Sequence, residues 1–301
     1  MTTIVMTGGT RGLGEVAANR MAAAPKTRLL LGARGSAPAD AQVLPLELCR
    51  LDSVRAFATE TAELVGHDDI DALVCNAGLS FRSVEERTPD GFETTFAVNH
   101  LAHYLLIRLL LPKLAHGARV VLTTSGTHDP AEKAPIPPPH HADARRLADP
   151  STDPQLDAKS KAAGNRAYSA SKLCNLLTAR ALAAQPEAID RKFTVVAYDP
   201  GPTPGTGLSR SYTPALRATW WLLGTPIGRV VPMLNSRAAA GGGLANLALG
   251  SVTPPPGEIY ARTVKNKLVW AQPSELARDD RVRDALWEDS AALVGLSTVT
   301  G

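Results

Sequence analysis

The chain has 301 residues, of which 44% are hydrophobic and 20% charged, so it can bury a sizeable core and is not compositionally disordered. Its net charge of +3 comes without a dense lysine and arginine block, which argues against a nucleic-acid surface. Three scattered cysteines argue against a disulfide framework, and an N-terminus without a charged and apolar leader argues against a secretory signal. The sequence has no long uninterrupted apolar run, so we do not expect a spanning helix. We therefore expect a cytoplasmic protein, with peripheral membrane contact still open.

Short, continuous apolar segments alternate with longer helical patterns along the chain. The expected helices include residues 51–64, 89–114 and 167–184, and the expected strands are residues 2–7, 28–33, 43–48, 71–77, 118–125, 193–199 and 257–262. Segments that are apolar at every position suit strands buried on both faces of a parallel sheet. The alternation predicts an α/β fold of Rossmann type, with a doubly wound, mostly parallel seven-stranded sheet flanked by helices.

Two segments interrupt this alternation. Residues 126–164 are polar and proline-rich, and we expect them to form a long surface excursion. Residues 202–234, after the sixth expected strand, are rich in proline, glycine and apolar side chains. Expected strands resume after each segment, so neither resembles a linker, and we expect a single domain over residues 1–301.

The segment TGGTRGLG, residues 7–14, follows the first expected strand and opens a helix. Glycines there let the backbone approach a pyrophosphate, whose charge the helix N-terminus favours. The spacing differs from G-x-G-x-x-G, and an ordinary tight turn is the alternative. The position at the first strand-to-helix turn favours a dinucleotide, held by Gly8, Thr10, Arg11, Gly12, Leu13 and Gly14.

The end of the second expected strand indicates which dinucleotide is bound. Dehydrogenases that use NAD commonly have an acidic residue there, whereas this chain has Arg34, with Arg11 in the glycine turn. Two guanidinium groups suit bidentate binding of a 2′-phosphate, although two solvated arginines are the alternative. We therefore expect NADPH or NADP+ rather than NADH.

The segment YSASK places Tyr168 and Lys172 four residues apart, and on a helix this spacing puts both side chains on one face. A tyrosine that donates its proton near neutral pH needs its pKa lowered by roughly three units, or about 4 kcal/mol, and a nearby ammonium favours that shift. The alternative is a surface tyrosine with an exposed lysine.

Six motifs occur in order along nearly the whole chain: TGGTRGLG, CNAG (75–78), FAVNHLAHYLL (96–106), TTS (123–125), YSASK (168–172) and DPG (199–201). Together they resemble the short-chain dehydrogenases/reductases. One branch of this family contains the retinol dehydrogenases and the light-dependent protochlorophyllide reductases, and its sequences resemble the segments VNHLAHYLL, SKLCNLLT and TGL of this chain. The protochlorophyllide enzymes in particular resemble the segment LWEDSAALVGL.

The resemblance implies four catalytic residues. Tyr168 would donate a proton to a carbonyl, Lys172 would lower the pKa of that tyrosine and bind the nicotinamide ribose, and Ser125 would hydrogen-bond the substrate oxygen. Asn99 would hold a helix kink and a relay water. Donors aimed at that oxygen suit the chemistry, because hydride delivery to a carbonyl carbon builds negative charge on it.

The resemblance also implies further cofactor contacts. Glu47 and Leu48 would lie at the adenine, and Pro200 and Gly201 would shape the nicotinamide pocket. Thr203 or Thr206 would hold the carboxamide or phosphates. The adenosine ribose would pack along Asn76, Ala77 and Gly78.

Residues 202–234 are expected to include a helical substrate lid, and Trp220 and Trp221 would close it over a bulky hydrophobic substrate. An oligomer contact or simple core packing is the alternative for these tryptophans. His128 follows Ser125 by three residues. Two interpretations remain open: His128 contacts the substrate, or it lies exposed on a loop. Pro202 stands where protochlorophyllide reductases typically have a cysteine, which argues against light-driven pigment reduction.

The sequence thus predicts an NADPH-dependent oxidoreductase acting on a carbonyl or alcohol. A sensor that binds NADP without turnover and a protochlorophyllide-type reductase of carbon–carbon double bonds are the alternatives. No metal site is expected, because His100 and His103 lack a third ligand nearby and suit helix packing. A monomer and a homo-oligomer both remain open.

Overall fold

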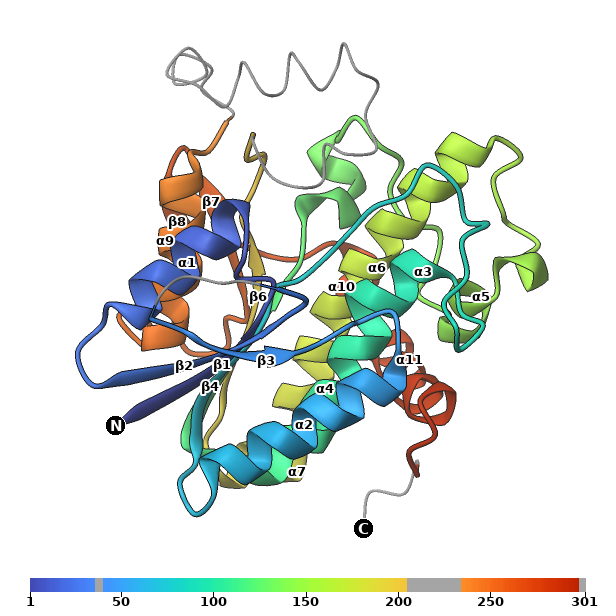
Figure 1. The fold of residues 1–301 in the computed structure, drawn as a ribbon. Helices are drawn as coiled ribbons and strands as arrows, with labels where there is room; N and C mark the ends of the chain where they lie inside the picture. The colour runs from blue at the N-terminus through green and yellow to red at the C-terminus, as the bar shows by residue number, and fades with distance from the viewer. Residues whose placement is uncertain (36–39, 205–233, 298–301) are drawn as a thin grey trace.

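The computed structural model describes residues 1–35, 40–204 and 234–297. An eight-stranded sheet lies at the centre, in the order β3-β2-β1-β4-β5-β6-β7-β8 (Figure 1). Pairing between neighbouring strands is parallel except for β8, which pairs antiparallel with β7. The strands are β1 (Thr2–Thr7), β2 (Thr27–Ala33), β3 (Gln42–Pro45), β4 (Ile70–Cys75), β5 (Leu114–Thr123), β6 (Thr194–Asp199), β7 (Tyr260–Val264) and β8 (Lys267–Trp270).

The Rossmann-type fold is confirmed, with one strand more than the seven expected. The additional strand, β8, follows β7 through a tight turn at Lys265 and Asn266, which both have positive φ (49° and 63°). Two positive φ values are the signature of a type I′ hairpin turn, whose usual sequence is Asn-Gly. Because Lys-Asn is a less common pair for this turn, the hairpin did not stand out in the sequence.

Helices cover both faces of the sheet. One face carries α1 (Gly12–Ala22) and α9 (Arg237–Leu249), and the opposite face carries α2, α4 and α6, with α11 packed outside α6 (Figure 1). The other α-helices in the described residues are α2 (Leu51–Val65), α3 (Thr94–Phe96), α4 (Ala102–Leu110), α5 (Ala144–Ala148), α6 (Ser160–Ala183), α7 (Pro186–Asp190), α10 (Glu275–Arg278) and α11 (Asp280–Leu293).

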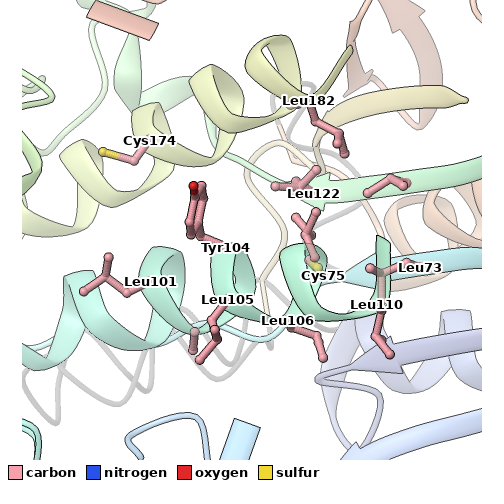
Figure 2. Close-up of a cluster of buried hydrophobic side chains, with 14 of the residues drawn as sticks. Leu73, Cys75, Leu101, Tyr104, Leu105, Leu106, Leu110, Leu122, Cys174 and Leu182 are labelled. Carbon is pink, nitrogen blue, oxygen red and sulfur yellow. The ribbon is translucent and has the colours of Figure 1, made fainter. Parts of the chain in front are cut away.

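Alternate residues of the central strands point to the two helical layers. In β1, Ile4 and Met6 pack toward α1 and α9, whereas Val5 packs toward α2 and α4, and all three are fully buried. Figure 2 shows part of the second layer, where Leu101 and Tyr104 lie opposite Cys174 of α6. Burial on both faces explains why the strands read as continuous apolar segments.

The long helix expected at 89–114 is divided. Its first turn, α3, begins after Glu93, whose carboxylate caps it by accepting bonds from the amides of Thr95 and Phe96 at 2.9 and 2.6 Å. A π-helical turn, η1 (Ala97–Leu101), then separates α3 from α4. The interruption places Asn99 in a wide turn, which the apolar pattern alone did not indicate.

The excursion at 126–164 is shorter than expected, because α6 begins at Ser160 rather than near residue 167. It contains α5 and is held in place by ion pairs of Arg146 with Asp153 and of Arg166 with Asp157.

Most of the expected lid, including Thr206, Trp220 and Trp221, lies outside the described residues. Among the helices that the structure describes, none combines the length and apolar character needed to cross a bilayer.

The strand order reverses direction beside β1, which makes a topological switch point in the sheet. From β1 the chain proceeds outward to β2 and β3, and from the adjacent β4 it proceeds the other way to β5, β6 and β7. In open α/β sheets, ligands bind outside the carboxyl ends of the strands at such a switch point. The residues that follow β1, β4, β5 and β6 therefore define the candidate site.

Candidate active site

The turn after β1 packs so closely against neighbouring backbone that several positions have room only for glycine. Gly8 and Gly12 have φ values of 71° and 62°, in the left-handed region that favours glycine. A Cβ at Gly8 would lie 2.6 Å from the backbone of Ala77, and one at Gly14 would lie 2.0 Å from the Gly8 oxygen. The turn therefore presses against the segment after β4 and brings the start of α1 to the switch point, where its free amide groups favour an anion.

Hydrogen bonds join the ends of three strands at this edge. The Thr7 hydroxyl oxygen accepts the amides of Asn76 and Ala77, each at 3.1 Å. The Asn76 side chain donates to the Gly8 carbonyl at 2.8 Å and accepts from the Thr123 hydroxyl at 3.1 Å. Asn76 thus fixes the relative positions of β1, β4 and β5, and the segment predicted to line the adenosine ribose is held rigidly.

Arg34 directly follows β2 and has an exposed side chain, and its Nη1 lies 3.3 Å from Oε2 of Glu47. The other carboxylate oxygen of Glu47 accepts the amide of Cys49 at 3.2 Å. Arg11, in the glycine turn, is also exposed, and Leu48 is buried. An exposed pair of this kind contributes less than about 1 kcal/mol, so Arg34 can leave Glu47 for a phosphate at little cost.

Tyr168 and Lys172 lie on one side of α6, with the lysine Nζ 5.8 Å from the centre of the tyrosine ring. Their side chains are buried, with exposures of 8% and 3%, so the alternative of two surface residues is wrong. Lys172 Nζ donates to the carbonyl of Thr123 at 3.1 Å. Burial lowers the pKa of Lys172 to about 8, against the opposing effect of the Asp199 charge.

Asn99 holds the π-helical turn against two other segments. Its Oδ1 accepts the amide of Leu79 at 2.8 Å, and its Nδ2 donates to the carbonyl of Leu79 and to Ser171 Oγ, both at 2.9 Å. Ser171 in turn donates to the carbonyl of Tyr168 at 2.7 Å. A Cβ on Gly78 would lie 3.2 Å from Lys172 Nζ and 3.3 Å from Asn99 Oδ1, so these groups converge on the segment after β4.

Ser125 follows β5, and its hydroxyl accepts a long bond from the Thr127 amide at 3.4 Å. Nearby His128 is 1% exposed, so the exposed loop position is wrong. Its Nδ1 donates to the Ser125 carbonyl at 2.7 Å, its Nε2 lies 3.5 Å from the Ser274 amide, and its ring meets Tyr260 edge-on. His128 therefore supports the Ser125 segment from within, and contact with substrate remains a prediction.

The turn after β6 contains the predicted nicotinamide residues. Gly201 has a φ of 64°, and a Cβ there would lie 2.4 Å from the side chain of Asn235. Thr203 donates to the carbonyls of Pro200 and Gly201 at 3.2 and 3.1 Å. Asn235 also donates to the Pro200 carbonyl at 3.1 Å, a support that the sequence analysis missed because Asn235 lies 35 residues away.

A second support was also missed. Arg262 of β7 binds Asp199 of the DPG motif through Nε at 3.0 Å and Glu132 through Nη2 at 2.8 Å. Asp199 Oδ1 also accepts the Gly201 amide at 2.8 Å. Since these partners lie 63 and 130 residues from Arg262, no local pattern indicated the network. Within the described ranges, no cluster of three or more His, Cys, Asp or Glu side chains is arranged to hold a metal ion.

Comparisons with known proteins identify several similar chains. A family model for short chain dehydrogenases matches residues 2–133. Protochlorophyllide reductase A of Hordeum vulgare is 31% identical over 323 residues, which cover 98% of this chain and 80% of the relative. Dehydrogenase/reductase SDR family member 13 of Bos taurus is 32% identical over 313 residues, covering 98% of this chain and 73% of the relative.

Solved structures show the same architecture. A protein from Mycobacterium paratuberculosis aligns with a TM-score of 0.69 and 25% identity, covering 99% of this chain and 95% of the other. A short chain dehydrogenase from Burkholderia cenocepacia, solved in complex with NADP, aligns with a TM-score of 0.57 and 21% identity, covering 84% of this chain and 91% of the other. The glycine turn, the Tyr168/Lys172 pair and the relatives matched over nearly the whole length lead to one conclusion: the chain belongs to the short-chain dehydrogenase/reductase family.

Proposed function

We propose that this protein is an NADPH-dependent oxidoreductase that transfers hydride between the nicotinamide and a carbonyl or alcohol of a bulky hydrophobic substrate. The observation that carries the proposal is the burial of Tyr168 and Lys172 on one side of α6, with Lys172 and Asn99 both beside Gly78. A buried, charged lysine is costly, and strongly perturbed titratable groups cluster at functional sites.

The cofactor assignment rests on the glycine turn and on charge. The turn brings the start of α1 to the switch point, which suits a pyrophosphate. Arg11 and Arg34 are exposed cations in the turn and at the end of β2, where an acidic residue would favour NAD. We assign the binding of the 2′-phosphate of NADPH to these two arginines. Arg34 exchanges its ion pair with Glu47 for a contact with this phosphate when the cofactor binds.

Four residues of this chain, Tyr168, Ser125, Lys172 and Asn99, act together with the cofactor in the proposed reaction. When bound, a dihydronicotinamide supplies the hydride. Tyr168 donates the proton to the substrate oxygen, and Ser125 donates a hydrogen bond to the same atom. Lys172 is cationic below its pKa of about 8, and its charge favours release of the Tyr168 proton. Asn99 fixes the π-helical turn beside Lys172 and takes part in the proton relay.

The substrate class is inferred from the sequence of residues 202–234. The apolar segment with Trp220 and Trp221 follows the nicotinamide turn, and we assign to it the binding of a bulky, hydrophobic carbonyl compound. The three cysteines are free, and Cys75 and Cys174 are buried, which supports a reducing compartment, the cytoplasm.

A second candidate function is reduction of a carbon–carbon double bond. It is favoured by the 31% identity with a protochlorophyllide reductase over 98% of the chain. Against it stands Pro202, at the position where the resemblance leads us to expect a cysteine. Catalysis by Tyr168 does not require that thiol, which is why we place carbonyl reduction first.

The test is NADPH consumption by the purified protein with a panel of hydrophobic aldehydes and ketones, and separately with protochlorophyllide in darkness and in light. We expect consumption with carbonyl compounds in darkness. Consumption that needs protochlorophyllide and light would replace this proposal with the second candidate. Tight NADPH binding without consumption under any condition would identify a sensor instead.

A further inference from the structure

A buried histidine of α4, His103, has both ring nitrogens bonded to elements of the candidate site. Its Nε2 lies 2.8 Å from the Thr7 hydroxyl, and its Nδ1 lies 3.0 Å from the carbonyl oxygen of Asn99. The side chain is 1% exposed. One imidazole therefore spans from the end of β1 to the π-helical turn η1.

The partners determine where the protons lie. A carbonyl oxygen only accepts, so Nδ1 must carry a proton and donate it to Asn99. Burial lowers the pKa of His103 to about 4, which leaves the ring neutral and Nε2 without a proton at physiological pH. Nε2 then accepts the Thr7 proton, which agrees with the acceptance of the Asn76 and Ala77 amides by the Thr7 oxygen.

The two ends of this chain of bonds have different tasks. Thr7 holds the amides of Asn76 and Ala77, in the segment to which we assign the adenosine ribose. Asn99 lies in the wide turn, where the amide of Ala102 bonds to the carbonyl of Ala97, five residues back. Such turns occur often at functional sites, and a side chain that binds a carbonyl within the turn helps to fix its shape.

We propose that His103 is a positioning residue that couples the cofactor-binding edge of β1 and β4 to the Asn99 turn. The proposal rests on the proposed function for its effect on turnover, while its effect on the cofactor segment is separate. It assigns to His103 a directed bond at each ring nitrogen, whereas a histidine that only fills the core would need just its shape.

Two amide variants separate the two bonds. Asparagine reaches the position of Nδ1 and can still donate to Asn99, whereas glutamine reaches the position of Nε2 and can still accept from Thr7. We expect His103→Asn to raise the Kd for NADPH about tenfold and to leave kcat at saturating NADPH within about threefold. We expect His103→Gln to lower kcat about tenfold and to leave the Kd within about threefold.

His100→Gln is the matched control, because His100 is equally buried in η1 and bonds through Nε2 to Ser290 of α11 instead. We expect the control to lower the melting temperature while both the Kd and kcat stay within about threefold of wild type. Identical effects of His103→Asn and His103→Gln on Kd and kcat, or a His103→Leu variant with wild-type values, would overturn the proposal.

A measurement without substitution covers the case in which the variants fail to fold. The ¹⁵N spectrum of wild-type protein labelled at histidine should show His103 with a protonated Nδ1 and an unprotonated Nε2, unchanged from about pH 5.5 to 8. The reverse tautomer, or titration near the ordinary histidine pKa of about 6.5, would contradict the bond directions. If the wild type reduces no carbonyl compound, the proposed function fails, and the NADPH Kd and this spectrum still decide the role of His103.

Discussion

Arg262 binds Asp199 with its Nε 3.0 Å from the carboxylate, and this pair joins β7 to the last residue of β6, directly before the turn that follows β6. The Asp199 side chain is 2% exposed, and its carboxylate contacts the Arg262 guanidinium and accepts the Gly201 amide. The same guanidinium reaches Glu132, beyond Ser125 in the chain. Arg262 therefore fixes the turn after β6, to which we assign the nicotinamide, relative to the segment that carries Ser125.

Removing this cation should damage both stability and the site. We expect Arg262→Met to lower the free energy of unfolding by about 3–5 kcal/mol, because it leaves a buried carboxylate without its partner. Adding Asp199→Asn to the same chain removes the uncompensated charge and should recover about half of the loss. Denaturant unfolding of the two single variants, the double variant and the wild type measures the coupling. Additive losses in the double variant would show that the pair is not coupled.

Lys172 should make the protein more stable at alkaline pH. Its folded pKa of about 8 lies below the value of about 10.4 for an unfolded lysine, so between these values the unfolded chain binds more protons. The free energy of unfolding should therefore rise with pH between about 8 and 10, by roughly 1–3 kcal/mol from this group.

Lys172→Met isolates that contribution. We expect the variant to be as stable as the wild type or more stable at pH 7, to lose the lysine-dependent rise between about pH 8 and 10, and to be almost inactive. Urea unfolding at several pH values, compared with Lys113→Met at a half-exposed lysine, makes the measurement. A variant that keeps the whole rise would show that another group titrates.

Arg34 should determine the choice between the two nicotinamide cofactors. We expect Arg34→Ala to weaken NADPH binding about ten- to hundredfold and to change NADH binding little, since only NADPH carries the 2′-phosphate. Glu47→Gln should tighten NADPH binding by no more than about fivefold, because the exposed pair that it releases is weak. Titration of cofactor fluorescence measures both. Arg50→Ala, another exposed arginine paired with a carboxylate, is the control that should leave the preference unchanged.

The parts of the fold that depend on local pattern could be predicted from the sequence. The strand at 2–7 and the helix at 51–64 agree with β1 and α2 within a residue, because buried strands and an amphipathic helix have distinct periods. Tyr168 and Lys172 share a face of α6 because their spacing alone fixes it.

The supports of the site could not be predicted, since they depend on which distant segments the fold brings together. Arg262 and Asn235 lie in segments without a recognisable motif, and the motif FAVNHLAHYLL contains His103 but does not indicate its partners. The partners of all three residues are set by the order of the strands and by the π turn. The π turn itself has no apolar signature, because its residues are buried on all sides and the pattern resembles that of the flanking helices.

The proton donor gives the most direct test of the chemistry. Tyr168→Phe removes one hydroxyl from a buried ring, so the ring packing is kept and the proton to the substrate oxygen is lost. We expect kcat for carbonyl reduction to fall by about 10²–10⁴, with the Kd for NADPH within about threefold of wild type. Stopped-flow or steady-state NADPH absorbance measures the first value and fluorescence titration the second.

A second buried tyrosine serves as the control for that substitution. Tyr198 of β6 donates to the Ala240 carbonyl at 2.7 Å, in the layer between the sheet and α9. Tyr198→Phe leaves that carbonyl without its partner and should cost about 1–2 kcal/mol of stability, with kcat nearly unchanged. If Tyr168→Phe behaves in the same way, lowering stability but not turnover, then the phenol of Tyr168 is a structural group and the acid must be sought elsewhere, with Ser125 as the first residue to examine.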